Sequence, residues 1–292
     1  MLEMVQWIES IEWMACRLYE DAAARFDDKA LCEFLDRLAR DEAWHAHLMA
    51  GAVEYVRTHA EAGIASAVAL NDEVRAHVET PLHQARDSLA RGELSERQMI
   101  EYVVTAEFSE WNTLFVYAIN TLKAYSRQFQ YGAAAVQAHE HRIEEFLRIM
   151  PAEMRPSRDI RELPRVWETR FLIVDDEQPL RDLFSRLLCR RGTVETAGNG
   201  AEALAMVRRT FYNVIISDVN MPVMDGMEFY RQAVADDPSV RLQFLFHTGA
   251  LTLVSGQFLE ANHLPYLVKP FALSAMTEMI DRILHVFPEP LH

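Results

Sequence analysis

The segment YNVIISDVNMPVMDG, residues 212–226, decides the fold of the carboxy-terminal part of this chain. It starts with a short apolar run that ends on Asp218, passes through Pro222 and an Asp225-Gly226 pair, and continues as the amphipathic stretch MEFYRQAVAD. An apolar run bounded by turn residues is typical of a buried strand, and the change to helical spacing indicates a helix. The segment therefore predicts a strand–loop–helix unit with an aspartate at the strand end.

Four similar apolar runs surround this unit, and amphipathic helical stretches separate them. The runs are FLIVDD (171–176), TVETA (193–197), LQFLFHTG (242–249) and PYLVKPF (265–271). Five strands that alternate with five helices predict an α/β doubly wound (βα)5 domain with a parallel five-stranded sheet. Ligands of such a sheet are expected at the carboxyl ends of its strands.

Polar residues stand at these strand ends. Asp175 and Asp176 close the first strand, Asp218 closes the third, Thr248 ends the fourth, and Lys269 ends the fifth. Clustered carboxylates form a negative pocket that suits a hard, oxygen-seeking cation such as Mg²⁺. The sequence thus predicts a magnesium-dependent site at this edge.

The set resembles the response-regulator receiver family over the whole length of that domain. The segment DVNMPVMDG (218–226) and the Lys269-Pro270 step are its most specific parts. The resemblance implies phosphorylation on Asp218 by a sensor histidine kinase or phosphotransfer protein, with Mg²⁺ on Asp175, Asp176 and Asp218. It further implies that Lys269 contacts the phosphoryl group and that Thr248 and Tyr266 form a switch pair.

The first half of the chain has helical spacing throughout. Apolar residues recur at three- and four-residue steps, which predicts helices over 2–26, 29–57, 95–127 and 130–150, with further helical turns within 60–92. The next stretch carries Pro151, Pro156 and Pro164, a composition typical of a linker. We expect an all-α bundle over 1–150, a linker over 151–168 and the receiver over 169–292.

Acidic residues fall on the apolar stripes of all four predicted helices. A buried isolated carboxylate costs several kcal/mol unless it is paired or binds metal. A dinuclear metal centre, in which carboxylates bridge two cations and imidazole ligates, resolves this cost. The inward-facing residues, with His139 at the edge of its face, are Glu12, Glu42, His45, Glu107, Glu110 and Glu140.

An internal sequence repeat supports a duplicated helix pair. SIEWMACRLY around Glu12 is similar to FSEWNTLFVY around Glu110, and the steps to Glu42 and Glu140 are equal (42 − 12 = 140 − 110). Residues 1–150 resemble the rubrerythrin branch of the ferritin-like four-helix bundles.

That resemblance implies that two iron ions bind at the inward-facing residues Glu12, Glu42, His45, Glu107, Glu110 and Glu140. The histidine expected in the fourth helix is Ile143 here, so His139 is the candidate substitute and His141 is expected to point away. No rubredoxin-type cysteine module accompanies the helices.

Two other interpretations of the helices stay open. In a metal-free bundle the acids would pair with Arg17, Arg37 or Arg40. A histidine phosphotransfer domain would need an exposed phosphoacceptor histidine with a lysine nearby, whereas His45 lies on an inward stripe with only Lys29 in the first two helices. The whole chain then reads as an oxygen, peroxide or redox sensor joined to a receiver. The alternatives are a receiver-gated di-iron oxidase or peroxidase and a metal-free phosphorelay adaptor.

Bulk composition limits the partners. The formal net charge of −15 argues against a nucleic-acid surface. Cys16, Cys32 and Cys189 are isolated, which excludes a disulfide scaffold and fits a reducing cytoplasm. The sequence shows neither a signal peptide nor a membrane span. We expect a cytoplasmic homodimer that acts on an unidentified downstream protein.

Overall fold

The computed structural model describes residues 1–59, 64–68, 70–163 and 167–285, with the backbone alone at 110, 152 and 285. The chain divides into two compact units, Met1–Val166 and Trp167–Leu291. Within the described ranges, no helix has the length and apolarity that a membrane span requires.

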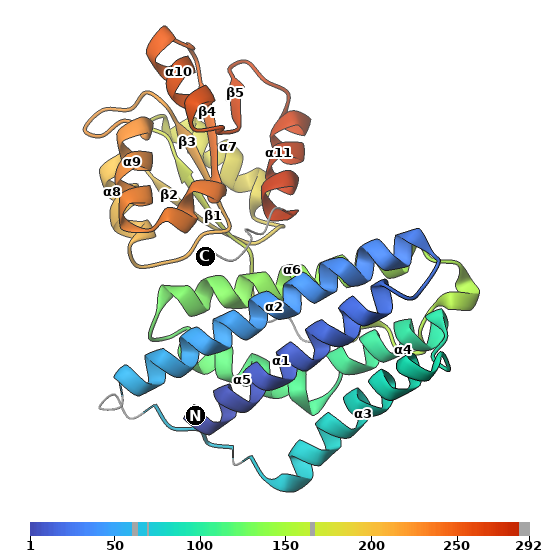
Figure 1. Ribbon diagram of the computed structural model, residues 1–292. Coiled ribbons are helices and arrows are strands. Elements are labelled where there is room, and N and C mark those ends of the chain that lie inside the picture. Colours follow the sequence, from blue (N-terminus) through green and yellow to red (C-terminus); the bar gives the residue numbers. More distant parts are fainter. Residues whose placement is uncertain (60–63, 69, 164–166, 286–292) are drawn as a thin grey trace. The chain divides into compact units, whose positions relative to one another are not determined.

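The described part of the first unit is helical (Figure 1). Its helices are α1 (Leu2–Ala23), α2 (Lys29–Thr58), α3 (Asp72–Arg91), α4 (Glu96–Glu107), α5 (Glu110–Leu122) and α6 (Arg127–Ile149), followed by the short 3-10 helices η2 (Ala152–Met154) and η3 (Ile160–Glu162). Helix α1 lies along α2 and also contacts α3 and α5, while α6 contacts α2 and α5. The shared interior is formed by their apolar stripes.

Local sequence sets several of these helix ends. The Asp28 side chain accepts a hydrogen bond from the Leu31 N–H and caps α2, and Ser95 with Gln98 forms a capping box on α4. Such caps satisfy backbone donors that the first turn of a helix leaves free.

The helix predicted over 95–127 is wrong as a single element. The chain leaves helical geometry after Glu107, and α5 starts anew at Glu110 with Ser109 as its cap. The Asn112 side chain donates a hydrogen bond to the Glu107 carbonyl oxygen, which the break leaves without an α-helical partner. The turns expected within 60–92 are in fact the 20-residue helix α3, which continues through Pro81. The ferritin-like four-helix bundle stays a prediction.

The second unit is a doubly wound α/β domain, as predicted. Its parallel sheet has the order β2-β1-β3-β4-β5. The strands are β1 (Arg170–Val174), β2 (Thr193–Ala197), β3 (Val214–Asp218), β4 (Phe244–Thr248) and β5 (Tyr266–Val268). The helices are α7 (Gln178–Leu188), α8 (Gly200–Val207), α9 (Gly226–Asp236), α10 (Leu253–Ala261) and α11 (Leu273–His285), with the 3-10 helix η4 (Pro238–Gln243) before β4.

Two apolar layers cover the sheet. Helices α8, α9 and α10 pack against one face of the sheet, and the apolar cluster between them includes Phe229, Phe244 and Phe246. Helices α7 and α11 pack against the other face, and the cluster there includes Phe184 and Ile216. Strands β3 and β4 are buried at every position, so the residues at their carboxyl ends are held by a rigid central sheet.

Candidate functional site

The polar residues predicted at the strand ends of the second unit meet at one edge of its sheet. Asp175 directly follows β1, Asp218 is the last residue of β3, Thr248 is the last residue of β4, and Lys269 directly follows β5. Parallel strands bring their carboxyl ends to the same edge, which is why residues far apart in sequence become neighbours.

Lys269 joins two of the carboxylates. Its Nζ lies 2.7 Å from Oδ2 of Asp218 and 3.3 Å from Oδ2 of Asp175. Burial alone would lower the pKa of Lys269, but the two carboxylates outweigh it and raise that pKa. Burial raises the pKa of Asp175, which has no exposed surface. A buried acid beside a cation and a second acid forms an anionic pocket that one more cation can neutralise.

The remaining predicted residues surround this pocket. The Thr248 hydroxyl accepts a hydrogen bond from the Asn220 side chain at 3.1 Å and donates one to the Ala250 carbonyl at 3.0 Å. Asp176 is exposed to solvent, and Tyr266 is half-buried on β5 against the apolar layer of α8, α9 and α10. The three carboxylates offer the oxygen ligands that Mg²⁺ prefers.

His247 was missed by the sequence analysis. It is buried one residue before Thr248, with Nε2 3.6 Å from Oδ2 of Asp175 and Nδ1 4.0 Å from Oδ2 of Asp218. Neither ring nitrogen makes a hydrogen bond within the described part of the chain. Burial is the main reason why its pKa falls to about 4. A histidine inside an apolar strand gives no sequence signal that separates it from core.

Comparisons with known proteins agree with this geometry. Residues 171–281 match the sequence model of the response regulator receiver domain. These residues form a receiver domain. Receiver domains bind Mg²⁺.

Relatives and solved structures share this part of the chain. The response regulator MprA of Mycobacterium leprae (strain TN) is 37% identical over 118 residues, which are 39% of this chain and 50% of that protein. The C4-dicarboxylate transport transcriptional regulatory protein DctD of Rhizobium meliloti (strain 1021) is 29% identical over 111 residues, 38% of this chain and 24% of that protein. The chain therefore spans half of the first relative and about a quarter of the second. Among solved structures, the chemotaxis protein CheY4 of Vibrio cholerae matches at 33% identity over 40% of this chain and 99% of that chain, with a TM-score of 0.37.

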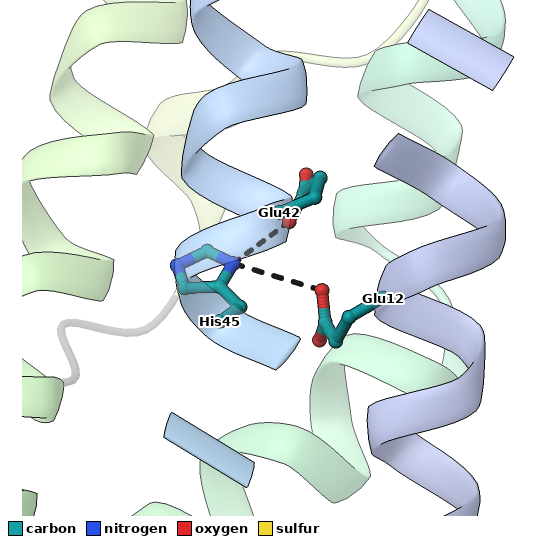
Figure 2. A group of neighbouring side chains, drawn as sticks. All are labelled: Glu12, Glu42 and His45. Atoms are coloured by element: carbon teal, nitrogen blue, oxygen red, sulfur yellow. Dashed lines mark hydrogen bonds and ion pairs between the residues drawn. The ribbon is translucent and has the colours of Figure 1, made fainter. Parts of the chain in front are cut away.

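A second group of polar residues lies inside the helical unit. Glu12 of α1 and Glu42 and His45 of α2 point toward one another (Figure 2). The Nδ1 atom of His45 lies 2.7 Å from Oε2 of Glu42 and 3.7 Å from Oε2 of Glu12, and all three side chains are buried. Burial raises the pKa of Glu12 to about 8. The two glutamates outweigh burial at His45 and raise its pKa to about 9.

The other oxygen of Glu42 belongs to a neighbouring group. Its Oε1 lies 3.9 Å from Nε2 of His139, and that nitrogen lies 3.1 Å from Oε1 of Glu107. The groups Glu12–Glu42–His45 and Glu42–Glu107–His139 each present ligand atoms close enough for one metal ion. Glu42 is common to both groups, with one oxygen in each.

The buried carboxylates leave one acceptor unused. Oε1 of Glu12 accepts a hydrogen bond from the Trp111 indole at 3.0 Å, but Oε2 is buried without a hydrogen-bond partner in the described chain. An unsatisfied buried carboxylate oxygen is costly, and a cation beside it removes that cost. The donor set of carboxylates and imidazoles fits a first-row transition ion.

One residue expected in this group, Glu140, has another position, and the side chain of a second is not described. Glu140 is buried outside the two groups, where its carboxylate accepts a hydrogen bond from Gln137 and burial raises its pKa to about 7. The side chain of Glu110 lies outside the described residues. His141 is half-exposed beside Glu144, whereas His139 is buried.

Two further residues were missed. Asp41 of α2 and Asn112 of α5 each hydrogen-bond a member of the second group. In the sequence each is a single polar residue next to a charged or aromatic one. Such a residue is usually exposed to solvent, so nothing marked it as part of a site.

Proposed function

We propose that this chain is a response regulator in which Asp218 accepts a phosphoryl group from a histidine kinase or phosphotransfer protein. A carboxylate oxygen of Asp218 forms the new P–O bond, and the phosphohistidine P–N bond breaks, so that the donor imidazole leaves. The observation that carries this proposal is the 2.7 Å contact between Lys269 and Asp218, beside the buried Asp175.

The other strand-end residues take supporting roles in this proposal. Asp175, Asp176 and Asp218 would hold Mg²⁺, which would supply positive charge toward the arriving phosphoryl group. Lys269 contacts a phosphoryl oxygen as a point charge, and Thr248 turns its hydroxyl from Ala250 to the same group. Tyr266 follows by turning inward, so that the surface beside β5 reports the phosphorylation state.

Acetyl phosphate with Mg²⁺ tests the phosphoacceptor directly. Intact-mass measurement of the full chain should show one added phosphoryl group, and Asp218→Asn should remove it because an amide is a poor nucleophile. Asp182→Asn is the matched control, since Asp182 is an exposed aspartate of α7 outside the pocket. Labelling that persists in Asp218→Asn contradicts the assignment.

The helical unit supports a second function, a dinuclear metal centre. In this proposal Glu12 and His45 would hold one ion, Glu107 and His139 would hold the other, and Glu42 would offer an oxygen to each. The supporting observations are the split of the two Glu42 oxygens between the groups and the unpartnered Oε2 of Glu12. When iron occupies such a site it supplies redox chemistry toward oxygen or peroxide, so the unit would sense one of these while the receiver reports a kinase signal.

Elemental analysis of anaerobically purified full chain tests this centre. We expect about two iron ions per chain by analogy with dinuclear carboxylate bundles, and Glu42→Gln should remove most of both because it serves both groups. Steady turnover of peroxide would favour a receiver-gated oxidase or peroxidase over a sensor. A chain that takes up no metal would instead be a phosphorelay adaptor. The homodimer and the downstream protein partner belong to this proposal, and sedimentation tests the former.

A further inference from the structure

The two halves of the candidate metal centre differ in how their ligands are held. His139 lies between two carboxylates, with Nδ1 3.1 Å from Oδ2 of Asp41 and Nε2 3.1 Å from Oε1 of Glu107. A carboxylate that accepts from one imidazole nitrogen fixes the ring orientation and leaves the other nitrogen as the ligand atom. Asp41 therefore aims Nε2 of His139 into the group that contains Glu107 and Glu42.

Asp41 is itself held in place. Oδ2 of Asp41 also accepts hydrogen bonds from the Arg142 guanidinium, whose Nη2 lies 2.7 Å away. Arg142 stands one helical turn after His139 on α6, so the same helix supplies the imidazole and the residue that anchors its partner. The position of His139 is thus fixed before any metal arrives.

Glu107 is restrained from the opposite side by Asn112. The Asn112 amide nitrogen lies 3.0 Å from Oε2 of Glu107 and 2.8 Å from its carbonyl oxygen. Both contacts exist because the chain breaks between α4 and α5, which brings the first turn of α5 back to the last residue of α4. With Oε2 occupied, Oε1 is the oxygen that faces His139.

The half with Glu12 and His45 lacks such supports on its histidine. Nδ1 of His45 faces the two glutamates, and its other nitrogen has no hydrogen-bond partner among the residues that the structure describes. Trp111 holds only one oxygen of Glu12. A metal ion entering this half must break the 2.7 Å contact between His45 and Glu42. The imidazole is held there by ring contacts with Trp44 and Phe115, and no hydrogen bond from outside the group orients it among the described residues.

We propose that the half-site of Glu107 and His139 binds its divalent first-row transition ion first and more tightly, and that the half-site of Glu12 and His45 binds second. Asp41 and Asn112 are the positioning residues that create this order, because a pre-organised site loses less conformational freedom on binding. If a metal ion bound Nε2 of His139, the proton on that nitrogen would pass to solvent, while Nδ1 would keep its proton and donate it to Asp41. The inference rests on the metal centre proposed above.

Titration of metal-free full chain with Co²⁺, followed by its visible absorption and by calorimetry, tests the order. Wild type should show a tight step and a weaker step. His139→Ala should lose the tight step, whereas His45→Ala should keep it and lose the weaker one. Loss of the tight step in His45→Ala, or two equal steps in wild type, overturns the inference. A wild-type chain that binds no Co²⁺ removes the metal centre as well, so the two failures are distinguishable.

Variants of the positioning residues separate orientation from general stability. Asp41→Ala should weaken the tight step about 10- to 100-fold and leave the weaker step unchanged, and Asp41→Asn should recover part of it because its amide oxygen still accepts from Nδ1. The control is Asp36→Ala, an exposed aspartate of the same helix. Equal weakening of both steps, or none, in Asp41→Ala refutes the positioning role. In metal-free protein, the nitrogen chemical shifts of His139 should report a retained Nδ1 proton that is lost in Asp41→Ala.

Discussion

Gly226 offers a sharp test of how the receiver positions Asp218, the proposed phosphoacceptor. A Cβ at this position would clash with the carbonyl oxygen of Asp218 and stand 3.1 Å from Oγ of Ser217. The Gly226 N–H also donates a hydrogen bond to the Val219 carbonyl at 3.0 Å, which ties the start of α9 to the end of β3. Gly226→Ala must therefore push α9 and the tip of β3 apart.

The cost follows from overpacking a buried contact between two backbone segments. Such changes cost about 1–3 kcal/mol. If β3 exchanges its amide hydrogens through opening of the receiver core, its exchange should accelerate roughly 5- to 150-fold. Labelling of Asp218 by acetyl phosphate should slow in the same variant, because its carboxylate shifts away from Lys269.

Hydrogen exchange read by mass spectrometry on the full chain provides the assay. Peptides from α1 and α2 act as an internal standard, since they belong to the other unit. Gly256→Ala is the matched variant, because a Cβ there meets only the Leu251 side chain at ordinary distance and alanine favours the helix. Unchanged exchange of β3 in Gly226→Ala, or equal acceleration in Gly256→Ala, would refute the steric reasoning.

Two further predictions concern buried titratable groups. Burial raises the pKa of the Cys16 thiol to about 11, so iodoacetamide at pH 8 should modify the exposed Cys189 and spare Cys16 until the chain unfolds; rapid modification of Cys16 in folded protein would contradict this. Burial lowers the pKa of His247 to about 4, below its ordinary value of 6.5, so the folded receiver binds fewer protons than the unfolded chain between these values. Stability should therefore fall as pH decreases from 6.5 toward 4, by at most about 3 kcal/mol, and His247→Leu should flatten this slope in urea titrations. Parallel slopes for wild type and variant would show that other groups cause the loss.

The receiver could be predicted from sequence because its signals are local and repeated. Each strand is an apolar run that ends on a polar residue, and the order of strands and helices leaves few topologies. Asp218 and Lys269 lie close together because the carboxyl ends of parallel strands meet at one edge of the sheet. His247 could not be found this way, because its contact with Asp175 depends on which face of β4 its side chain occupies, and an apolar strand that is buried on both faces does not reveal this.

In the helical unit, hydrophobic periodicity predicts which residues face inward but not where each helix ends. A 3.6-residue stripe marks an inward face, and Glu12, Glu42 and His45 do lie together on such faces. The stripe cannot locate a break such as the one at Ser109, since serine is common both inside and at the start of helices. Once the chain breaks there, Glu107 and Asn112 become neighbours, while Glu140 stays outside the groups that His139 joins.

The central position of β3 restricts how the receiver can report a change at Asp218. With β1 on one side and β4 on the other, this strand is paired along both edges and buried at every position, so it forms a stiff support for Asp218. Any movement that follows a change at Asp218 is therefore expected in the loops after β3 and β4 and not in the buried strands. Val223 in the loop after β3 and Leu253 and Val254 in the first turn of α10 are exposed. If Asp218 is phosphorylated as proposed, a downstream protein that contacts these three side chains would respond to movement of the surrounding surface and not to the carboxylates themselves.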